Sequence, residues 1–422
     1  MIQLLRHKSA FSRNVLTLMT GTTFAQAIPV AISPILTRIY SPDDFGVLAI
    51  FIAITAILGV MTNARYELAI MLPEKDEDAI NIAALGMLIS TAFSIILLFP
   101  AVLLNHQISS VLGNEEIGFW LYFVPVMVWL TGMYNVLNYL NTRKKTYKDI
   151  AKAKVYKSIA MASVQLGIGF VKSGASGLIW GHIASLFVSN FRLIRNAIAN
   201  YDLKKVSYKI QKEMALRHIS FPKYSLWAGL ANTSSFHITS ILISNIYSLT
   251  HLGFYSLMQR ALDIPASLIG SAIGQVFYQE AREEKQLTGS TKRSFSKTLK
   301  KLFLIGLLIF SMLYWVVEDV FAFVFGEEWR VAGIYAQILI PLVFVRFFVS
   351  PLIMMNVIYE KNRVDMSWQF SLLLLQVGLI IVASLLDLGF EEYLHLMVLI
   401  ISLHYLLILM IVSKYSNEAS NV

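Results

Sequence analysis

Two matching stretches decide the fold of this chain: Ile39-Tyr40-Ser41-Pro42-Asp43-Asp44-Phe45-Gly46 and, 207 positions later, Ile246-Tyr247-Ser248-Leu249-Thr250-His251-Leu252-Gly253. Each stretch is a short link between two long apolar segments. These segments cover about 14–38 and 45–64 in the first copy, and about 224–246 and 252–277 in the second. In a chain of 422 residues this spacing is close to half the length. Many secondary transporters are built from such internal repeats, so the pattern predicts two related helical bundles.

The composition is that of an integral membrane protein. Hydrophobic residues make up 56% of the chain and charged residues 14%, and the mean hydropathy is +0.63. Soluble domains carry about 25% charged residues. The net charge of +9 would point to nucleic acid only on a water-soluble basic face, so no nucleic-acid partner is expected. The absence of cysteine excludes disulfides and thiolate metal sites.

Apolar runs long enough to cross a membrane predict twelve spans, six on each side of a basic stretch at about 199–222. The expected domains are an N-terminal six-helix bundle over 1–205 and a C-terminal six-helix bundle over 206–422. The basic stretch interleaves lysines with apolar residues. This pattern fits an amphipathic helix on the anionic inner leaflet and a solvated linker about equally well. The expected spans are centred near residues 26, 55, 91, 129, 162, 187, 235, 265, 310, 345, 376 and 403.

The distribution of lysine and arginine predicts that both termini are cytoplasmic. With that orientation, the inner segments hold 30 of the 35 basic residues, whereas the outer connections hold only Arg38, Lys172 and Arg330. A cleaved signal peptide is the competing interpretation, since Ala25-Gln26-Ala27 resembles a cleavage site. The apolar stretch continues past that site to Ile39, which favours a retained span.

Several motifs predict local structure. Ser41 with Asp44 forms a capping-box pattern around Pro42, typical of a helix N-terminus. Two small-residue motifs, Gly177/Gly181 and Gly270/Gly274, have the spacing that lets helices approach closely. Prolines inside the expected spans bend helices and favour a cavity, where freed carbonyls find partners. They are Pro29, Pro34, Pro125, Pro265, Pro341 and Pro351.

Charged residues inside spans usually face a cavity or a partner. Arg260 and Asp263 lie three residues apart on one helix face, so they form either a self-neutralised pair or part of a site. Arg346 lies near the middle of its span and has no carboxylate within four residues along the chain. It is the strongest candidate for binding an anionic substrate.

Other candidates lie at span ends or are single imidazoles. Arg38, Arg65 and Glu67 sit where long side chains can reach the interface, so a structural role is as plausible as substrate contact. His237 is a weaker candidate for ion coupling. The sequence lacks the P-loop, H-E-x-x-H and G-x-S-x-G motifs, and its outer links are too short to form a catalytic domain. We therefore expect no enzyme, no catalytic residue, no metal site and no cofactor.

Four segments of the sequence resemble the Wzx-type O-antigen and polysaccharide flippases, which belong to the multidrug/oligosaccharidyl-lipid/polysaccharide exporter superfamily. The segments are Leu36-Thr37-Arg38-Ile39-Tyr40-Ser41-Pro42-Asp43-Asp44-Phe45-Gly46, Arg65-Tyr66-Glu67-Leu68-Ala69-Ile70-Met71-Leu72-Pro73, Gly253-Phe254-Tyr255-Ser256-Leu257 and Leu268-Ile269-Gly270-Ser271-Ala272-Ile273-Gly274-Gln275-Val276-Phe277-Tyr278-Gln279-Glu280-Ala281.

The resemblance implies a V-shaped, alternating-access transporter in the bacterial inner membrane, acting in lipopolysaccharide biosynthesis. The implied substrate is an undecaprenyl-diphosphate-linked oligosaccharide, turned from the cytoplasmic to the periplasmic leaflet. Membrane lipid, a polysaccharide polymerase and a chain-length regulator are the other implied partners. Related flippases use a cationic cavity, to which Arg346 and Arg260 would contribute, with Arg38 and Arg65 at its rims. The alternatives are a cation-coupled multidrug exporter of the same superfamily and, from another class, an O-antigen polymerase or membrane glycosyltransferase.

Overall fold

The computed structural model describes residues 2–172 and 174–417, without the side chains of 2–19, 263–269, 271, 272, 275, 362 and 417. Within the described residues there is no strand, and twelve helices have 20 or more residues. Each predicted span centre falls inside one of them. The twelve are α1 (Ile2–Ile39), α2 (Pro42–Met61), α4 (Asp76–Leu103), α7 (Val124–Arg143), α8 (Tyr147–Gly169), α9 (Ser176–Asn200), α11 (Leu226–Ile246), α12 (Leu249–Thr288), α13 (Lys292–Phe325), α14 (Arg330–Val349), α16 (Asn362–Leu385) and α17 (Phe390–Asn417).

Seven of these helices, within the described residues, are long and apolar enough by themselves to cross a membrane: α2, α4, α9, α13, α14 with its flanking turns, α16 and α17. The other five, α1, α7, α8, α11 and α12, are long enough but contain more polar and charged residues. Such residues are tolerated in a membrane helix where they face other protein groups or water. Short elements connect the long helices: α3 (Tyr66–Ala69), α5 (Asn105–Val111), α6 (Glu116–Leu121), η1 (Leu203–Lys205), α10 (Tyr208–Arg217), η2 (Phe221–Ser225), η3 (Glu327–Trp329), η4 (Ser350–Met354) and α15 (Met355–Ile358).

The chain forms two compact units, Met1–Asn245 and Ile246–Val422. Helix α11 belongs to the first unit, because the side chains of Ser244 and Asn245 at its end donate hydrogen bonds to the carbonyls of Leu112 and Val111, over 3.3 and 2.7 Å. The predicted domain boundary between residues 205 and 206 rests on the internal sequence repeat and not on helix packing. It stays a prediction.

The two matching stretches form the same structure. Ser41 caps α2 with a full capping box, in which its hydroxyl accepts the Asp44 N–H at 3.3 Å and the Asp44 carboxylate accepts the Ser41 N–H at 2.9 Å. Ser248 caps α12 by accepting the N–H of His251 at 3.1 Å. The predicted capping box is therefore confirmed, and the repeat carries a serine cap at the corresponding position.

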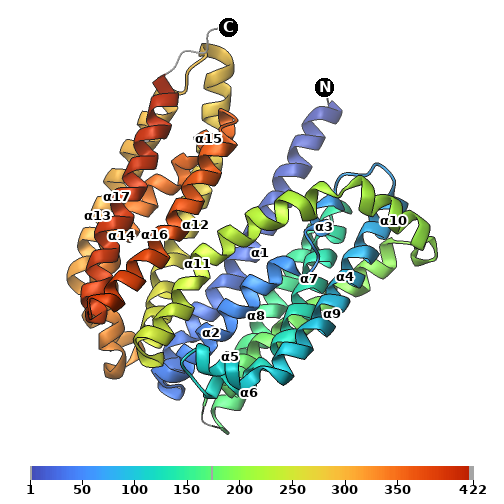
Figure 1. The fold of residues 1–422 in the computed structure, drawn as a ribbon. Helices are drawn as coiled ribbons and strands as arrows, with labels where there is room; N and C mark the ends of the chain where they lie inside the picture. Colours follow the sequence, from blue (N-terminus) through green and yellow to red (C-terminus); the bar gives the residue numbers. More distant parts are fainter. Residues whose placement is uncertain (1, 173, 418–422) are drawn as a thin grey trace. The chain divides into compact units, whose positions relative to one another are not determined.

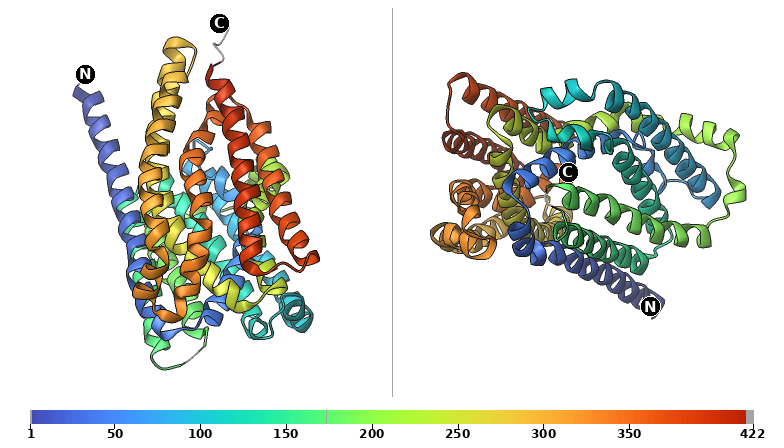
Figure 2. Two further views of the ribbon diagram at one scale, coloured as in Figure 1. Left: turned by 90° about the vertical axis from the view of Figure 1, so that its left-hand side faces the viewer. Right: turned by 90° about the horizontal axis from the view of Figure 1, so that it is seen from below.

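In the first unit, α8 packs against both α1 and α9 (Figure 2, right). Close approach depends on Tyr40, whose hydroxyl donates to the Gln165 carbonyl at 2.6 Å, and on glycines that leave room for it. A Cβ at Gly177 would overlap the Tyr40 hydroxyl, and one at Gly181 would overlap the Gln165 side chain. The predicted packing role of this glycine pair is confirmed. Gly270 and Gly274 only reach ordinary contact with Pro351.

In the second unit, α14 lies between α13 and α17 (Figure 1). Its N-terminal half joins an aromatic cluster in which His251 Nδ1 and the Tyr335 hydroxyl lie 2.7 Å apart, with Phe390 stacked on the His251 ring. The cluster connects the start of α12 to α14 and α17. It fixes the second serine-capped link within its own unit.

The prediction for Pro125 was wrong, because this proline stands in the first turn of α7. Pro351 lies inside the candidate span Glu327–Ile358, where α14 changes into the 3-10 helix η4. Proline is well accommodated in a first helical turn, because the N–H it lacks would have no helical partner there. Pro29, Pro34 and Pro341 do lie inside helices, as does Pro100 in α4. The side chain of Pro265 lies outside the described residues.

The basic stretch after α9 contains η1 and α10, and it is tied to the first unit. Asn81 of α4 donates to the Lys205 carbonyl at 2.9 Å and accepts from the Ser207 N–H at 2.8 Å. Met214 of α10 is buried in the apolar core beneath it, whereas Leu216 and Ile219 are exposed. One face of the amphipathic helix therefore packs on protein, and its other face is open.

The close packing of α8 and α9 can be tested with two glycines. In Gly181→Ala the new Cβ would overlap Gln165 and lie 3.0 Å from the Met161 carbonyl oxygen. We expect a loss of about 1–3 kcal/mol from overpacking, seen as a lower unfolding temperature in detergent. The matched control is Gly167→Ala on α8, where a Cβ meets no atom within 4 Å. Equal unfolding temperatures for the two variants would contradict this account.

Candidate functional site

The two strongest candidates lie in helices of the second unit that are in contact. Arg260 is in α12 and Arg346 is in α14, and both are partly buried. Arg346 lies near the middle of the 32-residue candidate span Glu327–Ile358. The side chain of Asp263 lies outside the described residues, so its pairing with Arg260 stays a prediction.

The weaker candidates of the first unit have separate surroundings. Arg38 is exposed in the last turn of α1, where its guanidinium donates to the Pro34 carbonyl of the same turn. A cation at this place also complements the negative end of the helix dipole. His237 is partly buried on α11. Neither residue is brought into the ion pair formed by Arg65 and Glu67.

A rigid turn after α2 positions Arg65. Its anchors are Thr62, whose hydroxyl lies 2.9 Å from that of Ser90, and Asn63, which donates to the Gly86 carbonyl at 3.0 Å. Ala64 and Arg65 then both adopt the left-handed conformation, with φ of 49° and 65°. Each such residue costs about 1–2 kcal/mol when it is not glycine. The surrounding contacts hold this strain and direct the Arg65 side chain.

Arg65 forms an ion pair with the buried Glu67, with Nη1 and Oε1 3.5 Å apart. The guanidinium lies against Gly229 of α11, where a Cβ would be only 3.2 Å from both Cζ and Nη2. Within the described residues, Arg65 Nε and Glu67 Oε2 are buried and make no hydrogen bond. The pair is therefore a polar, incompletely satisfied centre among α3, the end of α2 and α11.

Burial raises the pKa of Glu67 above its ordinary value, and a backbone hydrogen bond and the positive charge of Arg65 act in the opposite direction. Desolvation dominates because the 3.5 Å ion pair is long and only one carboxylate oxygen takes part. The pair can hold a proton more readily than an exposed carboxylate could.

Two lysines on α8 are further candidates that the sequence pattern did not single out. Lys154 and Lys157 lie within the helix, with Lys157 about halfway along its 23 residues. The Lys154 ammonium donates to the Thr22 hydroxyl of α1 at 3.0 Å. The Lys157 ammonium lies 5.0 Å from the centre of the Tyr134 ring on α7. The missed signal was their spacing of three, which places both on one helix face.

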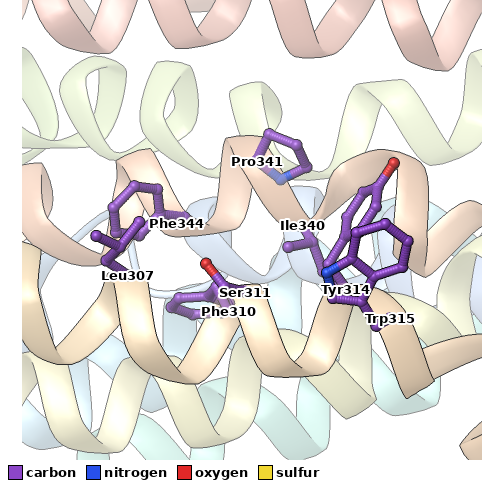
Figure 3. Close-up of a pocket in the computed structure, with 8 residues that line it drawn as sticks. All are labelled: Leu307, Phe310, Ser311, Tyr314, Trp315, Ile340, Pro341 and Phe344. Atoms are coloured by element: carbon purple, nitrogen blue, oxygen red, sulfur yellow. The ribbon is translucent and has the colours of Figure 1, made fainter.

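The second unit also has an apolar groove of ≈ 240 Å³ between α13 and α14 (Figure 3). Pro341 and Phe344 line it from α14, and Leu307, Phe310 and Trp315 line it from α13. Ser311 and Tyr314 contribute the only side-chain oxygens among its lining residues. The lining of this groove suits a hydrocarbon chain, and none of its lining residues offers a charged group to a phosphate.

Comparison with known proteins identifies the family. A family model described as polysaccharide biosynthesis protein matches residues 35–334, which is more than half of the chain. The chain belongs to this family. It is 23% identical over 324 residues to the succinoglycan biosynthesis transport protein ExoT of Rhizobium meliloti (strain 1021), covering 74% of this chain. The match spans 61% of the length of that relative.

Solved structures share the fold. The inward closed conformation of the lipid II flippase MurJ matches with a TM-score of 0.70 at 11% identity, over 95% of this chain and 90% of that one. An inward-facing multidrug resistance MATE family transporter of the MOP superfamily matches with a TM-score of 0.61 at 13% identity, over 95% and 96%. The prediction of an all-α membrane-transporter fold is confirmed, and the family model places the chain in a polysaccharide biosynthesis family.

The pH dependence of stability tests the environment of Glu67. Its folded-state pKa is raised, so between the unfolded and folded pKa values the folded protein binds more protons, and stability falls as the pH rises through that window. Each unit of pKa difference contributes about 1.4 kcal/mol. We therefore expect the unfolding temperature of Glu67→Gln, measured relative to wild type in detergent, to rise as the pH increases from mildly acidic to neutral. Glu74→Gln, at an exposed carboxylate, is the control. Parallel pH profiles for both variants would refute the assignment.

Proposed function

We propose that this family member translocates an undecaprenyl-diphosphate-linked oligosaccharide from the cytoplasmic to the periplasmic leaflet of the bacterial inner membrane, with both termini cytoplasmic. Family membership supports a polysaccharide precursor as the cargo. The name of the relative in succinoglycan transport and the fold shared with a lipid II flippase support a lipid-linked form of it. Movement by alternating access fits the two compact units.

The observation that carries this proposal is the position of two arginines within their helices. Arg260 follows the start of α12 by eleven residues, or about 16 Å of helix rise. Arg346 lies near the middle of a 32-residue candidate span. The hydrocarbon core is about 30 Å thick, so a helix that entered it at the start of α12 would hold Arg260 near its centre, as the span of α14 would hold Arg346. Charges are retained at that depth almost only where they line a pathway or meet a partner.

Arginine is suited to a diphosphate because its planar guanidinium offers several donors to phosphate oxygens and stays charged. An anionic head group moving outward from a negative cytoplasm also gains about 2.3 kcal/mol per charge per 100 mV. The hydrocarbon part of the substrate has no need of such groups. An apolar surface like the groove between α13 and α14 provides the matching environment.

The proposal extends to partners. Because translocation delivers the precursor to the periplasmic leaflet, the reaction that follows must consume it there. A polysaccharide polymerase and a chain-length regulator are therefore the proposed downstream partners, and membrane lipid is the surrounding solvent. Removal of the product by polymerisation would also pull the transport forward.

The role of Arg346 can be tested in a deletion strain complemented with variants. Arg346→Ala should lower surface polysaccharide by about tenfold or more, which corresponds to a lost charge-assisted hydrogen bond of about 1.5–3 kcal/mol. Arg346→Lys, which keeps the charge but loses the planar donor fork, should restore part of it. The measurements are surface glycan, the amount of protein in the membrane, and the leaflet accessibility of the lipid-linked precursor.

The matched control is Arg363→Ala, an exposed arginine at the start of α16 in the same unit. It should transport like the wild type. Normal surface glycan in the Arg346→Ala strain would remove Arg346 from the transport path. A deletion strain with normal glycan and altered drug tolerance would instead refute the substrate class.

A further inference from the structure

Lys154 and Lys157 lie inside helix α8, away from both of its ends. Helix α8 has 23 residues and a length of about 34 Å, only slightly more than the hydrocarbon core of about 30 Å. To cross the membrane it must therefore use nearly its whole length. Lys154 and Lys157 then start about 10 and 15 Å from the Tyr147 end of the helix.

Neither lysine has an acidic partner in the part of the chain that the structure describes. Within the described residues, no carboxylate oxygen lies within 4.0 Å of either ammonium group. The other contacts are the Thr22 hydroxyl and the Tyr134 ring. Both are dipolar or polarisable groups, and neither carries a compensating charge.

Three arginines of the first unit do have a carboxylate partner. Arg65 has Glu67, Arg192 of α9 has Asp149 at 2.5 Å, and Arg143 of α7 has Asp76 at 2.9 Å. The two lysines of α8 differ from these arginines, because no carboxylate among the described residues pairs with them.

Two cations three residues apart on one helix face repel each other, and removing them from water adds a further penalty. An anion between them would relieve both effects. A group with several oxygens and more than one negative charge fits best, because each lysine acts as a point charge toward phosphate. Asn138 adds a polar group one turn from Tyr134 on α7, and its buried Oδ1 makes no hydrogen bond within the described residues. It offers an acceptor to a hydroxyl donor.

We propose that Lys154 and Lys157, with the Thr22 hydroxyl, form a binding site for the phosphate groups of a lipid-linked diphosphate inside the first unit. The proposal rests on the function proposed above and adds a second cationic element to it. Because α7 and α8 meet at a short turn beside basic residues, the site lies nearest the leaflet at which that turn emerges. In the proposed orientation this is the cytoplasmic leaflet, so the site receives the substrate before it moves outward.

Binding can be measured by native mass spectrometry of the purified full chain in detergent. The probes are farnesyl diphosphate, which carries the diphosphate on a short isoprenoid, farnesol, which lacks the charge, and phosphatidylglycerol, which carries a single phosphate. We expect Lys154→Gln and Lys157→Gln each to weaken farnesyl diphosphate binding by about tenfold, and the double variant more. Farnesol binding should not change.

Two controls separate binding from structure. Lys152→Gln removes an exposed lysine from the same helix and should bind like the wild type. Lys157→Arg keeps the charge and should restore binding. Because the lysines repel each other, Lys157→Gln should unfold at a temperature no lower than that of the wild type. A purely structural lysine would give a lower unfolding temperature.

Unchanged farnesyl diphosphate binding in the double variant would overturn the proposal. Loss of phosphatidylglycerol binding alone would assign the site to a lipid head group and would also overturn it. These outcomes are independent of the Arg346 transport test. If Arg346→Ala abolishes transport while the lysine variants bind normally, the site fails and the function stands. If the lysine variants lose binding while Arg346→Ala transports normally, this site stands and the role of Arg346 fails.

Discussion

A polar or charged group inside a membrane must find its partner within the protein, because the surrounding hydrocarbon offers none. In the first unit this constraint explains several hydrogen bonds between helices. Asn190 of α9 donates to the Leu130 carbonyl of α7 at 2.8 Å, and Asn141 of α7 donates to the Leu193 carbonyl of α9 at 3.2 Å. Such packing satisfies the amide donors of both asparagines.

The sequence predicted the features that depend on local chemistry. The helix positions followed from apolar length, and the cap of α2 followed from Ser41 and Asp44, because a side chain three residues away can satisfy a terminal N–H without help from the fold. The packing role of Gly177 and Gly181 followed from their spacing in the same way. Such features are encoded within one or two helical turns.

Prediction from the sequence failed where the role assigned to a residue depends on the exact boundary of a helix. Counting apolar runs places charges at the ends of spans, so Lys154 and Lys157 were not singled out although α8 begins at Tyr147. The same uncertainty put Pro125 inside a helix that in fact begins beside it. The surroundings of Arg65 could not be predicted either. They include Gly229, which is distant in the sequence and lies close to Arg65 only in the folded chain.

The basic residues of the chain fall into two groups according to their location. Many basic residues lie at helix ends and in short connections, where carboxylates such as Asp76 and Glu77 offset them and water reaches them. Arg260 and Arg346 in the second unit and the α8 lysines in the first belong to helix interiors, where such solvation is limited. A protein needing only stability would be better served by apolar residues there, since replacing buried charges by well-packed hydrophobic groups is often stabilising. Positive charge in the helix interiors of both units is the feature that the proposed anionic substrate would require.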